Sequence, residues 1–328
     1  MRLGAHALII KNEVHMPKGL EISKKYFETC LPVLKQCIPD IMEHAATGLA
    51  GEGSDCLGFD DATSRDHDWG PAFCLWLPES LLRSEAARIE QAIDLLPKSF
   101  MGFAARMAPQ DRSGRVGPMA VEVFYRQFLG MPRAPETWRE WRAIPEYHLC
   151  SSTNGAVFMD NEGVFSAIRN KLLKYYPEDL RRKKIAARCM IMAQTGQYNL
   201  PRCLSRGDFV PAMLAAARFS EAALSMVYLL NRRFMPFYKW AARGAAELPV
   251  LGRETVRLLD GLSQTAWSST YQSSQAVQQI ENLCSLVAET LRKTHLSEVD
   301  GDWLWAHGPS VQLGVREPEI RRLNVMED

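Results

Sequence analysis

The sequence lacks the features that mark secreted, membrane-spanning or nucleic-acid-binding proteins. Its eight cysteines include no Cys-x-x-Cys pair and no apolar leader opens the chain, so we expect reduced thiols and a cytoplasmic location. No uninterrupted apolar run approaches the length of about 18 residues that spans a bilayer, which predicts no membrane partner. An excess of one charge is also missing, because 39 basic residues stand against 38 acidic ones. We therefore do not expect a long nucleic acid as a partner.

The chain does have a high apolar content and two different patterns of apolar residues along its length. With 328 residues and 47% hydrophobic content it can bury a substantial core, and its length favours two domains. Strand and helix patterns alternate in the first part, whereas helical periodicity dominates the second. We predict an α+β protein. Its mixed sheet with flanking helices would occupy residues 1–160, and an all-α helical bundle would occupy residues 161–328.

The same patterns place individual elements. In residues 1–160 we predict a helix from Leu20, a second helix with Ser84 as its N-cap, and strands within 46–54, 72–77, 100–107 and 119–125. In residues 161–328 we predict helices at 164–175, 178–195, 208–234, 236–247 and 270–294. The basic run 181–184 is expected to be a solvated helix face, and the tail from Asp300 to be irregular.

The most informative stretch is GEGSDCLGFDDATSRDHDWGP at 51–71, where closely spaced aspartates follow a Gly-Ser turn. Like charges repel, so either the loop is solvated or a cation lies among the carboxylates. Asp66 and Asp68 are two residues apart, so on a strand both would point to one face and His67 to the other. Such a pair suits Mg²⁺, which completes its coordination with water and phosphate oxygens.

Two further features extend this candidate site. Glu122 lies between Val121 and Val123 on the strand predicted at 119–125, and it is the candidate third acid of a two-metal site. Gly53 lets backbone amides approach a phosphate, and Ser54 adds a hydroxyl donor. Together these groups predict in-line nucleotidyl transfer with release of pyrophosphate.

These residues resemble the signature of the nucleotidyltransferase superfamily, which includes kanamycin nucleotidyltransferase and DNA polymerase beta. Gly53-Ser54, eleven further residues and then Asp66-His67-Asp68 follow its Gly-Ser and acid-any-acid pattern, and Gly58 also matches. The wider stretch GFDDATSRDHDWGPAF is similar to a bacterial family known only as a domain of unknown function. In that family a strand with a central Glu matches AVEVF, and a helical segment matches PFYKW at 236–240. The resemblance covers most of residues 20–250.

The resemblance implies roles for these residues. Asp66 and Asp68 would bind two Mg²⁺ ions, with Mn²⁺ as an alternative, and Glu122 would be the third acid or the base for the acceptor hydroxyl. The residues that contact the nucleotide would be Gly53, Ser54, Ser64, Arg65 and Lys239.

The activity that we expect is Mg²⁺-dependent transfer of a nucleoside monophosphate, first of all AMP from ATP, to a hydroxyl of a small molecule. Two alternatives stay open. One is an enzyme of toxin-antitoxin type that transfers AMP to a protein, and the other is a non-catalytic nucleotide-binding sensor or scaffold. A homodimer is also compatible, because antibiotic-modifying relatives build sites across a dimer.

Overall fold

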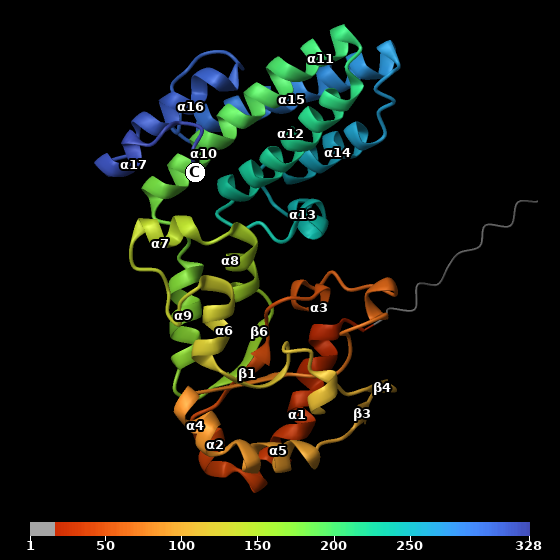
Figure 1. Ribbon diagram of the computed structural model, residues 1–328, viewed down its shortest axis with the longest axis vertical. Coiled ribbons are helices and arrows are strands. Elements are labelled where there is room, and N and C mark those ends of the chain that lie inside the picture. Colours follow the sequence, from red (N-terminus) through yellow and green to blue (C-terminus); the bar gives the residue numbers. More distant parts are fainter. Residues whose placement is uncertain (1–16) are drawn as a thin grey trace, which may run out of the picture. The chain divides into compact units, whose positions relative to one another are not determined.

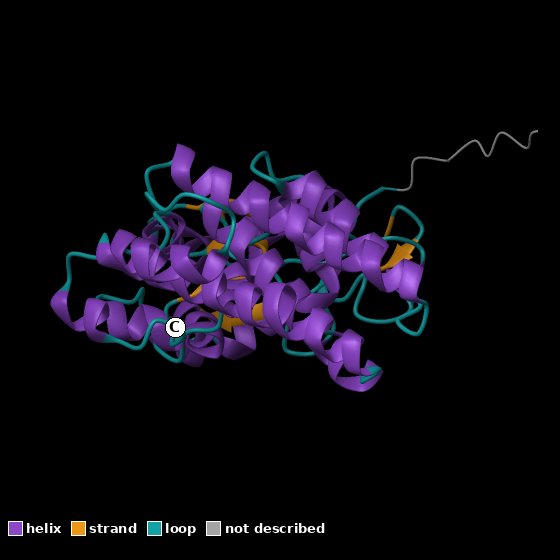
Figure 2. Cartoon of the chain, turned by 90° about the horizontal axis from the view of Figure 1, so that it is seen from above, coloured by secondary structure: helices purple, strands orange, loops and turns teal. Residues whose placement is uncertain are grey.

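A computed structural model describes residues 17–328, which divide into two compact units. Unit 1 comprises the described residues up to Val121 together with Asn154–Phe165, and unit 2 comprises Glu122–Thr153 and Ser166–Asp328. Helices make up most of the structure and strands a small part (Figure 2). A mixed sheet with many helices agrees with the α+β class that the sequence predicts.

Unit 1 is built on a four-stranded sheet with the order β5-β2-β1-β6 (Figure 1). The strands are β1 (Ala46–Leu49), β2 (Cys74–Leu77), β5 (Gly117–Ala120) and β6 (Ala156–Asp160). Strand β1 runs antiparallel to β2 and β6, whereas β5 runs parallel to β2. All four residues of β2 are fully buried, which explains why this strand is a continuous apolar run rather than an alternating one.

Short helices surround this sheet. They are α1 (Gly19–Cys37), α2 (Pro39–Glu43), α3 (Ser54–Leu57), α4 (Glu79–Ser84) and α5 (Ala86–Asp94), with the 3₁₀ turns η1 (Thr63–Arg65) and η2 (Pro109–Asp111) and the hairpin β3 (Ser99–Phe100) and β4 (Phe103–Ala104). Helix α1 buries an aromatic face: the rings of Tyr26 and Phe27 lie 6.0 and 5.3 Å from the ring of Phe73, just before β2. These contacts fix α1 against the sheet.

Unit 2 is helical. Its elements are α6 (Val121–Leu129), whose first residue belongs to unit 1, α7 (Trp138–Ala143), α8 (Glu146–Thr153), α9 (Val164–Leu173), whose first two residues belong to unit 1, α10 (Glu178–Met192), the π-helical segment η3 (Ala193–Asn199), α11 (Leu200–Arg206), α12 (Phe209–Leu230), α13 (Tyr238–Ala245), α14 (Gly252–Ser263), α15 (Thr270–Lys293), α16 (Leu304–Leu313) and α17 (Pro318–Arg322). Helix α10 packs against α12 and α16, and α14 packs against α12 and α15. Figure 1 shows α10 and α12 side by side.

Helix α12 forms much of the apolar core of this unit. Within residues 17–328 it is the one helix that is long and apolar enough to cross a membrane by length and composition, and 56% of its most apolar window is buried. A core helix of a bundle has the same composition.

Several predicted elements are confirmed, and others are wrong. Strands β1 and β2 and the five helices predicted beyond residue 160 are present, with ends shifted by a few residues. The predicted strand at 119–125 is wrong from Val121 onward, because α6 begins there. Its buried residues have helical spacing: Val121, Phe124, Tyr125, Phe128 and Leu129. A short apolar run does not distinguish a strand from a buried helix.

Three smaller predictions also need correction. The segment 100–107 holds only parts of the short hairpin β3–β4. Ser84 ends α4 instead of capping α5, whose N-cap residue Glu85 makes no capping bond from its side chain. The tail from Asp300 is not irregular, because it contains α16 and α17.

The basic run 181–184 is mostly buried, which contradicts the expected solvated face. Lys183 is fully buried, and its Nζ donates to the carbonyls of Asn324 and Val325 at 2.8 and 3.0 Å. Lys184 Nζ lies 3.7 Å from Oδ2 of Asp328. The C-terminal residues therefore supply the partners of these lysines, and sequence periodicity could not indicate that contact.

Burial makes the stability contribution of Lys183 depend on pH. Desolvation lowers the pKa of Lys183 to about 8, although the nearby carboxylate of Asp328 acts in the opposite direction. The unfolded chain keeps the ordinary lysine pKa of about 10.4, so between these values it binds more protons than the native state. We therefore expect the stability of the wild type relative to Lys183→Met to rise between about pH 8 and about pH 10. Urea unfolding of both proteins at several pH values measures this difference.

The matched control is Lys293→Met, because the Lys293 side chain is 72% exposed. Its stability difference from the wild type should stay nearly constant over the same pH range. A Lys183→Met difference that is equally flat would contradict the burial of an ionisable amine.

Candidate functional site

The turn between β1 and α3 contains the residues predicted to bind phosphate. Gly53 has φ 127° and ψ 146°, a conformation that residues with a side chain rarely adopt, and a Cβ there would overlap the carboxylate of Asp55. The Asn154 side chain accepts from the Gly51 N–H at 2.9 Å and donates to the Gly51 carbonyl at 2.7 Å. Ser54 is the first residue of α3. The turn is thus held at Gly51 and requires glycine at 53.

The acidic pair lies in a loop and not on a strand, so the predicted strand placement is wrong. Asp66 follows η1, its side chain is 64% exposed, and Oδ1 lies 2.8 Å from Nδ1 of His67. Strand β2 begins only at Cys74. Gly70 has φ 142°, and Pro71 has no N–H to donate to a neighbouring strand. These two residues lie between the acids and β2, so the pairing of β2 does not extend back to the acids.

Burial separates the other aspartates of this stretch. Asp55 and Asp60 are both buried, and Oδ2 of Asp60 accepts from the Gly19 N–H at 2.8 Å and from Nε1 of Trp69 at 3.0 Å. Burial raises the pKa of Asp55, and the nearby guanidinium of Arg106 acts in the opposite direction. Asp60 therefore anchors the loop to the start of α1.

Asp68 is held more firmly than Asp66. Its Oδ1 accepts from Oγ of Ser113 at 2.6 Å and lies 3.9 Å from Nη1 of Arg106, and its Oδ2 lies 3.4 Å from Nη1 of Arg115. The hydrogen bond from Ser113 is the largest cause that lowers the pKa of Asp68, and the two arginines add to it against desolvation. Asp68 is therefore ionised at neutral pH.

Arg106 is a candidate functional residue that sequence reasoning missed. It is only 8% exposed, and its Nε and Nη1 atoms have no hydrogen-bond partner. Desolvation lowers the pKa of Arg106, while the carboxylates of Asp55 and Asp68 act in the opposite direction. An arginine stays charged in proteins, so this buried guanidinium has unused donors that fit the oxygens of a phosphate or carboxylate.

Arg115 connects the turn to the acidic loop. Its Nη2 lies 3.7 Å from Oε2 of Glu52, its Nη1 contacts Asp68, and its side chain is 32% exposed. The pairing of Gly117 with Cys74 brings the start of β5, and with it Arg115, beside the start of β2. The motif spacing contains no signal for either arginine, because a strand pairing places Arg115 and a backbone hydrogen bond from the Arg106 N–H to the Pro71 carbonyl, at 2.9 Å, places Arg106.

Ser64 and Arg65 make contacts that shape the loop. The amide and the hydroxyl of Ser64 both donate to Oδ1 of Asp61 at 3.0 Å. The Arg65 guanidinium lies 4.2 Å from the ring centre of Trp69, and its Nη2 donates to the Pro17 carbonyl at 3.2 Å. Their predicted contacts with a nucleotide stay predictions.

Glu122 and Lys239 both belong to unit 2. Glu122 lies in the first turn of α6, and Lys239 is exposed on α13 with Nζ 5.4 Å from the ring centre of Trp240. Because β5 runs parallel to β2, the chain leaves β5 at the end of this strand pair opposite to the end that the acidic loop enters. The groups that unit 1 brings together are the turn, Asp68 and the two arginines. The roles of Glu122 and Lys239 stay predictions.

The acidic pair fits a metal site only in part. Among residues 17–328 no group of three or more His, Cys, Asp or Glu side chains could hold a metal ion. The two carboxylates at Asp66 and Asp68 are nevertheless the donors that suit a Mg²⁺ ion when phosphate oxygens and water supply its remaining ligands. A phosphate-bearing ligand would therefore be needed to complete the site.

Comparisons with known proteins give two matches. The family described as "Domain of unknown function (DUF4037)" matches residues 141–241, which include PFYKW but not the stretch 51–71. The chain is also similar to the crystal structure of a nucleotidyltransferase-like protein from Exiguobacterium sibiricum 255-15. That similarity has 10% sequence identity and a TM-score of 0.35, and it covers 83% of this chain and 81% of the other. No curated protein matches the chain.

Gly53→Ala should destabilise the protein by about 1–3 kcal/mol, because the backbone conformation at this position is nearly restricted to glycine. The new Cβ would also meet the Asp55 carboxylate. Urea unfolding gives the free-energy change.

Gly58→Ala is the matched control. Gly58 also has a positive φ, of 71°, but a Cβ there meets nothing within 4 Å. The control should lower the free energy of unfolding by about 1 kcal/mol, which is the cost of the left-handed conformation alone. Equal losses in the two variants would contradict the crowded turn at Gly53.

Proposed function

We propose that the chain is a nucleotidyltransferase that moves a nucleoside monophosphate, first of all AMP from ATP, to a hydroxyl of a small molecule and releases pyrophosphate. One observation carries the proposal. Asp68 lies within ion-pair distance of Arg106 and Arg115, and Arg115 also contacts the turn that holds Gly53 and Ser54. An ionised acid and under-used guanidinium groups beside a partly exposed glycine turn are the groups that recognise a triphosphate.

The two arginines would bind the phosphates in different ways. Nε of Arg106 has no hydrogen-bond partner, and Nη1 has only the 3.9 Å ion pair with Asp68. Arg115 lies 3.4 and 3.7 Å from its two carboxylate partners, which is longer than the 2.7–2.9 Å of a strong charge-assisted bond. A phosphate oxygen can therefore replace these partners at little cost. The buried charge of Arg106 would stabilise the leaving pyrophosphate as its negative charge grows, whereas Arg115 would bind the triphosphate before the reaction.

The acidic pair supports the other half of the reaction. Asp66 and Asp68 would hold Mg²⁺ together with phosphate oxygens, and this ion would supply charge neutralisation and orientation at the α-phosphorus. Asp68 is already ionised, so no proton has to leave it at neutral pH. Glu122 and Lys239 stay the proposed third acid and the proposed triphosphate contact, on the strength of the sequence resemblance.

Exchanging both acids tests the activity. The purified protein is incubated with each labelled NTP, Mg²⁺ or Mn²⁺ and cell extract, and pyrophosphate and labelled products are measured. Asp66→Asn combined with Asp68→Asn should lower the rate by a factor of about 10²–10³ or more, because electrostatic stabilisation of the transferred group is lost. Asp94→Asn is the matched control, since the Asp94 side chain is 72% exposed in the same unit.

Arg115→Ala provides a second readout that is more specific for phosphate binding. It should raise KM for the NTP more than it lowers kcat, because Arg115 contacts the ground-state triphosphate in this proposal. Pyrophosphate release at the wild-type rate from the double Asn variant would overturn the proposal. Nucleotide binding without any pyrophosphate release would instead identify the non-catalytic sensor.

A further inference from the structure

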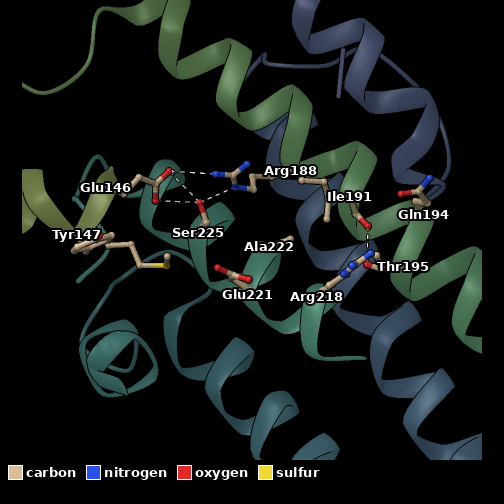
Figure 3. A pocket seen from close by; sticks show the side chains of 11 residues that line it. Glu146, Tyr147, Arg188, Ile191, Gln194, Thr195, Arg218, Glu221, Ala222 and Ser225 are labelled. Atoms are coloured by element: carbon tan, nitrogen blue, oxygen red, sulfur yellow. Dashed lines mark hydrogen bonds and ion pairs between the residues drawn. The ribbon is translucent and has the colours of Figure 1, made fainter. Parts of the chain in front are cut away.

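Unit 2 contains a pocket of about 490 Å³ that shares no lining residue with the acidic loop (Figure 3). This volume is typical of sites for small molecules. Helix α10 and η3 contribute one wall and α12 the facing wall, while α8 and the segment after α12 close the side. The lining residues are Glu146, Tyr147, Arg188, Ile191, Gln194, Thr195, Arg218, Glu221, Ala222, Ser225 and Met235. All of them lie within residues 141–241, the segment that matches DUF4037.

The helices leave this space for identifiable reasons. At the pocket, α12 carries the small residues Ala222 and Ser225 where a larger apolar side chain would fill the seam with α10. Helix α10 also continues into the π-helical segment η3, and Pro201 follows it in α11 without an N–H for the preceding turn. This wider turn presents the adjacent residues Gln194 and Thr195 to the pocket. Such π segments occur frequently at functional sites.

The floor of the pocket is a closed network of charges. Nε of Arg188 donates to Oγ of Ser225 at 2.8 Å, and this hydroxyl lies 3.2 and 3.1 Å from the two carboxylate oxygens of Glu146. Nη2 of Arg188 lies 3.4 Å from Oε1 of Glu146 (Figure 3). Nη1 of Arg188 lies 2.5 Å from Oδ2 of Asp328. These charges satisfy one another, so they form a rigid floor and need no charged ligand.

The mouth of the pocket differs, because its charges are unpaired. Arg218 and Glu221 are three residues apart on α12, a spacing at which opposite charges on a helix usually pair. Within residues 17–328, however, neither side chain makes a hydrogen bond or an ion pair, and Figure 3 shows their charged ends pointing away from one another. Gln194, on the facing wall, also has no hydrogen-bond partner among the described residues.

We propose that this pocket binds a small zwitterion with an α-amino-acid head group, toward which the exposed side chains of Arg218 and Glu221 would turn their charged ends. Arg218 would bind the carboxylate of the ligand, and Glu221 would bind its ammonium group. A ligand with a single charge would leave one of these two residues unsatisfied, whereas a zwitterion matches both. Gln194 and Thr195 offer neutral hydrogen-bonding groups for the rest of the molecule, and Ile191 offers apolar contact.

Binding of free amino acids to the full chain tests this proposal without any nucleotide, so the outcome is independent of the transferase activity. The common L-amino acids are screened by thermal shift, and those that raise the melting midpoint are measured by calorimetry. Each is compared with its decarboxylated amine and its N-acetyl derivative. We expect at least one amino acid to bind and both derivatives to bind about tenfold more weakly or worse, since each lacks one charge-assisted contact.

Two variants assign the two contacts. Arg218→Gln should weaken binding of the amino acid about tenfold but leave the affinity for the amine unchanged. Glu221→Gln should weaken binding of the amino acid by a similar factor but leave the affinity for the N-acetyl derivative unchanged. Both residues are exposed, so both variants should keep the wild-type melting midpoint without ligand. Arg206→Gln, at an exposed position on α11, is the matched control. Absence of binding by every amino acid, or equal binding by wild type and both variants, would overturn the proposal.

Discussion

The parallel pairing of β5 with β2 is the constraint on which the candidate site of unit 1 depends. Cys74 pairs with Gly117, so Arg115 lies beside the start of β2, at the end of the strand that the acidic loop enters. Asp68 is ionised in a half-buried position because Ser113 and the two arginines lie near it. Without this strand pairing Asp68 would lose Arg115, the nearer of its two arginine partners.

In unit 2 it is buried positive charge that needs compensation. Lys183, Lys184 and Arg188 form a buried positive stripe on α10, and the charges and carbonyls that compensate it come from α8 and from the C-terminal residues. Removing one partner of such a buried pair typically costs about 3–5 kcal/mol, because the other charge stays buried. The same network forms the floor of the pocket, so the C-terminal tail and the shape of the pocket depend on each other.

Periodicity predicts the parts of this fold whose burial is regular. Strand β2 follows from its apolar pattern because it buries every side chain, and helix α12 follows because its apolar residues recur over 22 residues, 11 of which are buried. Helix α16 buries Leu304, His307, Gly308 and Val311, which have helical spacing, but a histidine, a glycine and Pro309 hide that pattern. The Gly-Ser spacing identifies the turn and Asp68. Arg106 and Arg115 could not be predicted, because a pairing between residues far apart in sequence places them, and a single sequence contains no signal for it.

The two sites share one physical property, which is charge that the protein itself does not satisfy. A buried donor without a partner costs about 1–3 kcal/mol, so the orientation of Arg106 is unfavourable unless a ligand offsets it. At the mouth of the pocket the cost is smaller because Arg218 and Glu221 are solvated, yet they forgo the pairing that their spacing allows. A buried guanidinium with donors that lack hydrogen-bond partners favours an anion, whereas an exposed pair of opposite charges favours a molecule that carries both. The chemistry of each ligand class therefore follows from how deeply each unpaired charge is buried and from which opposite charges lie beside it.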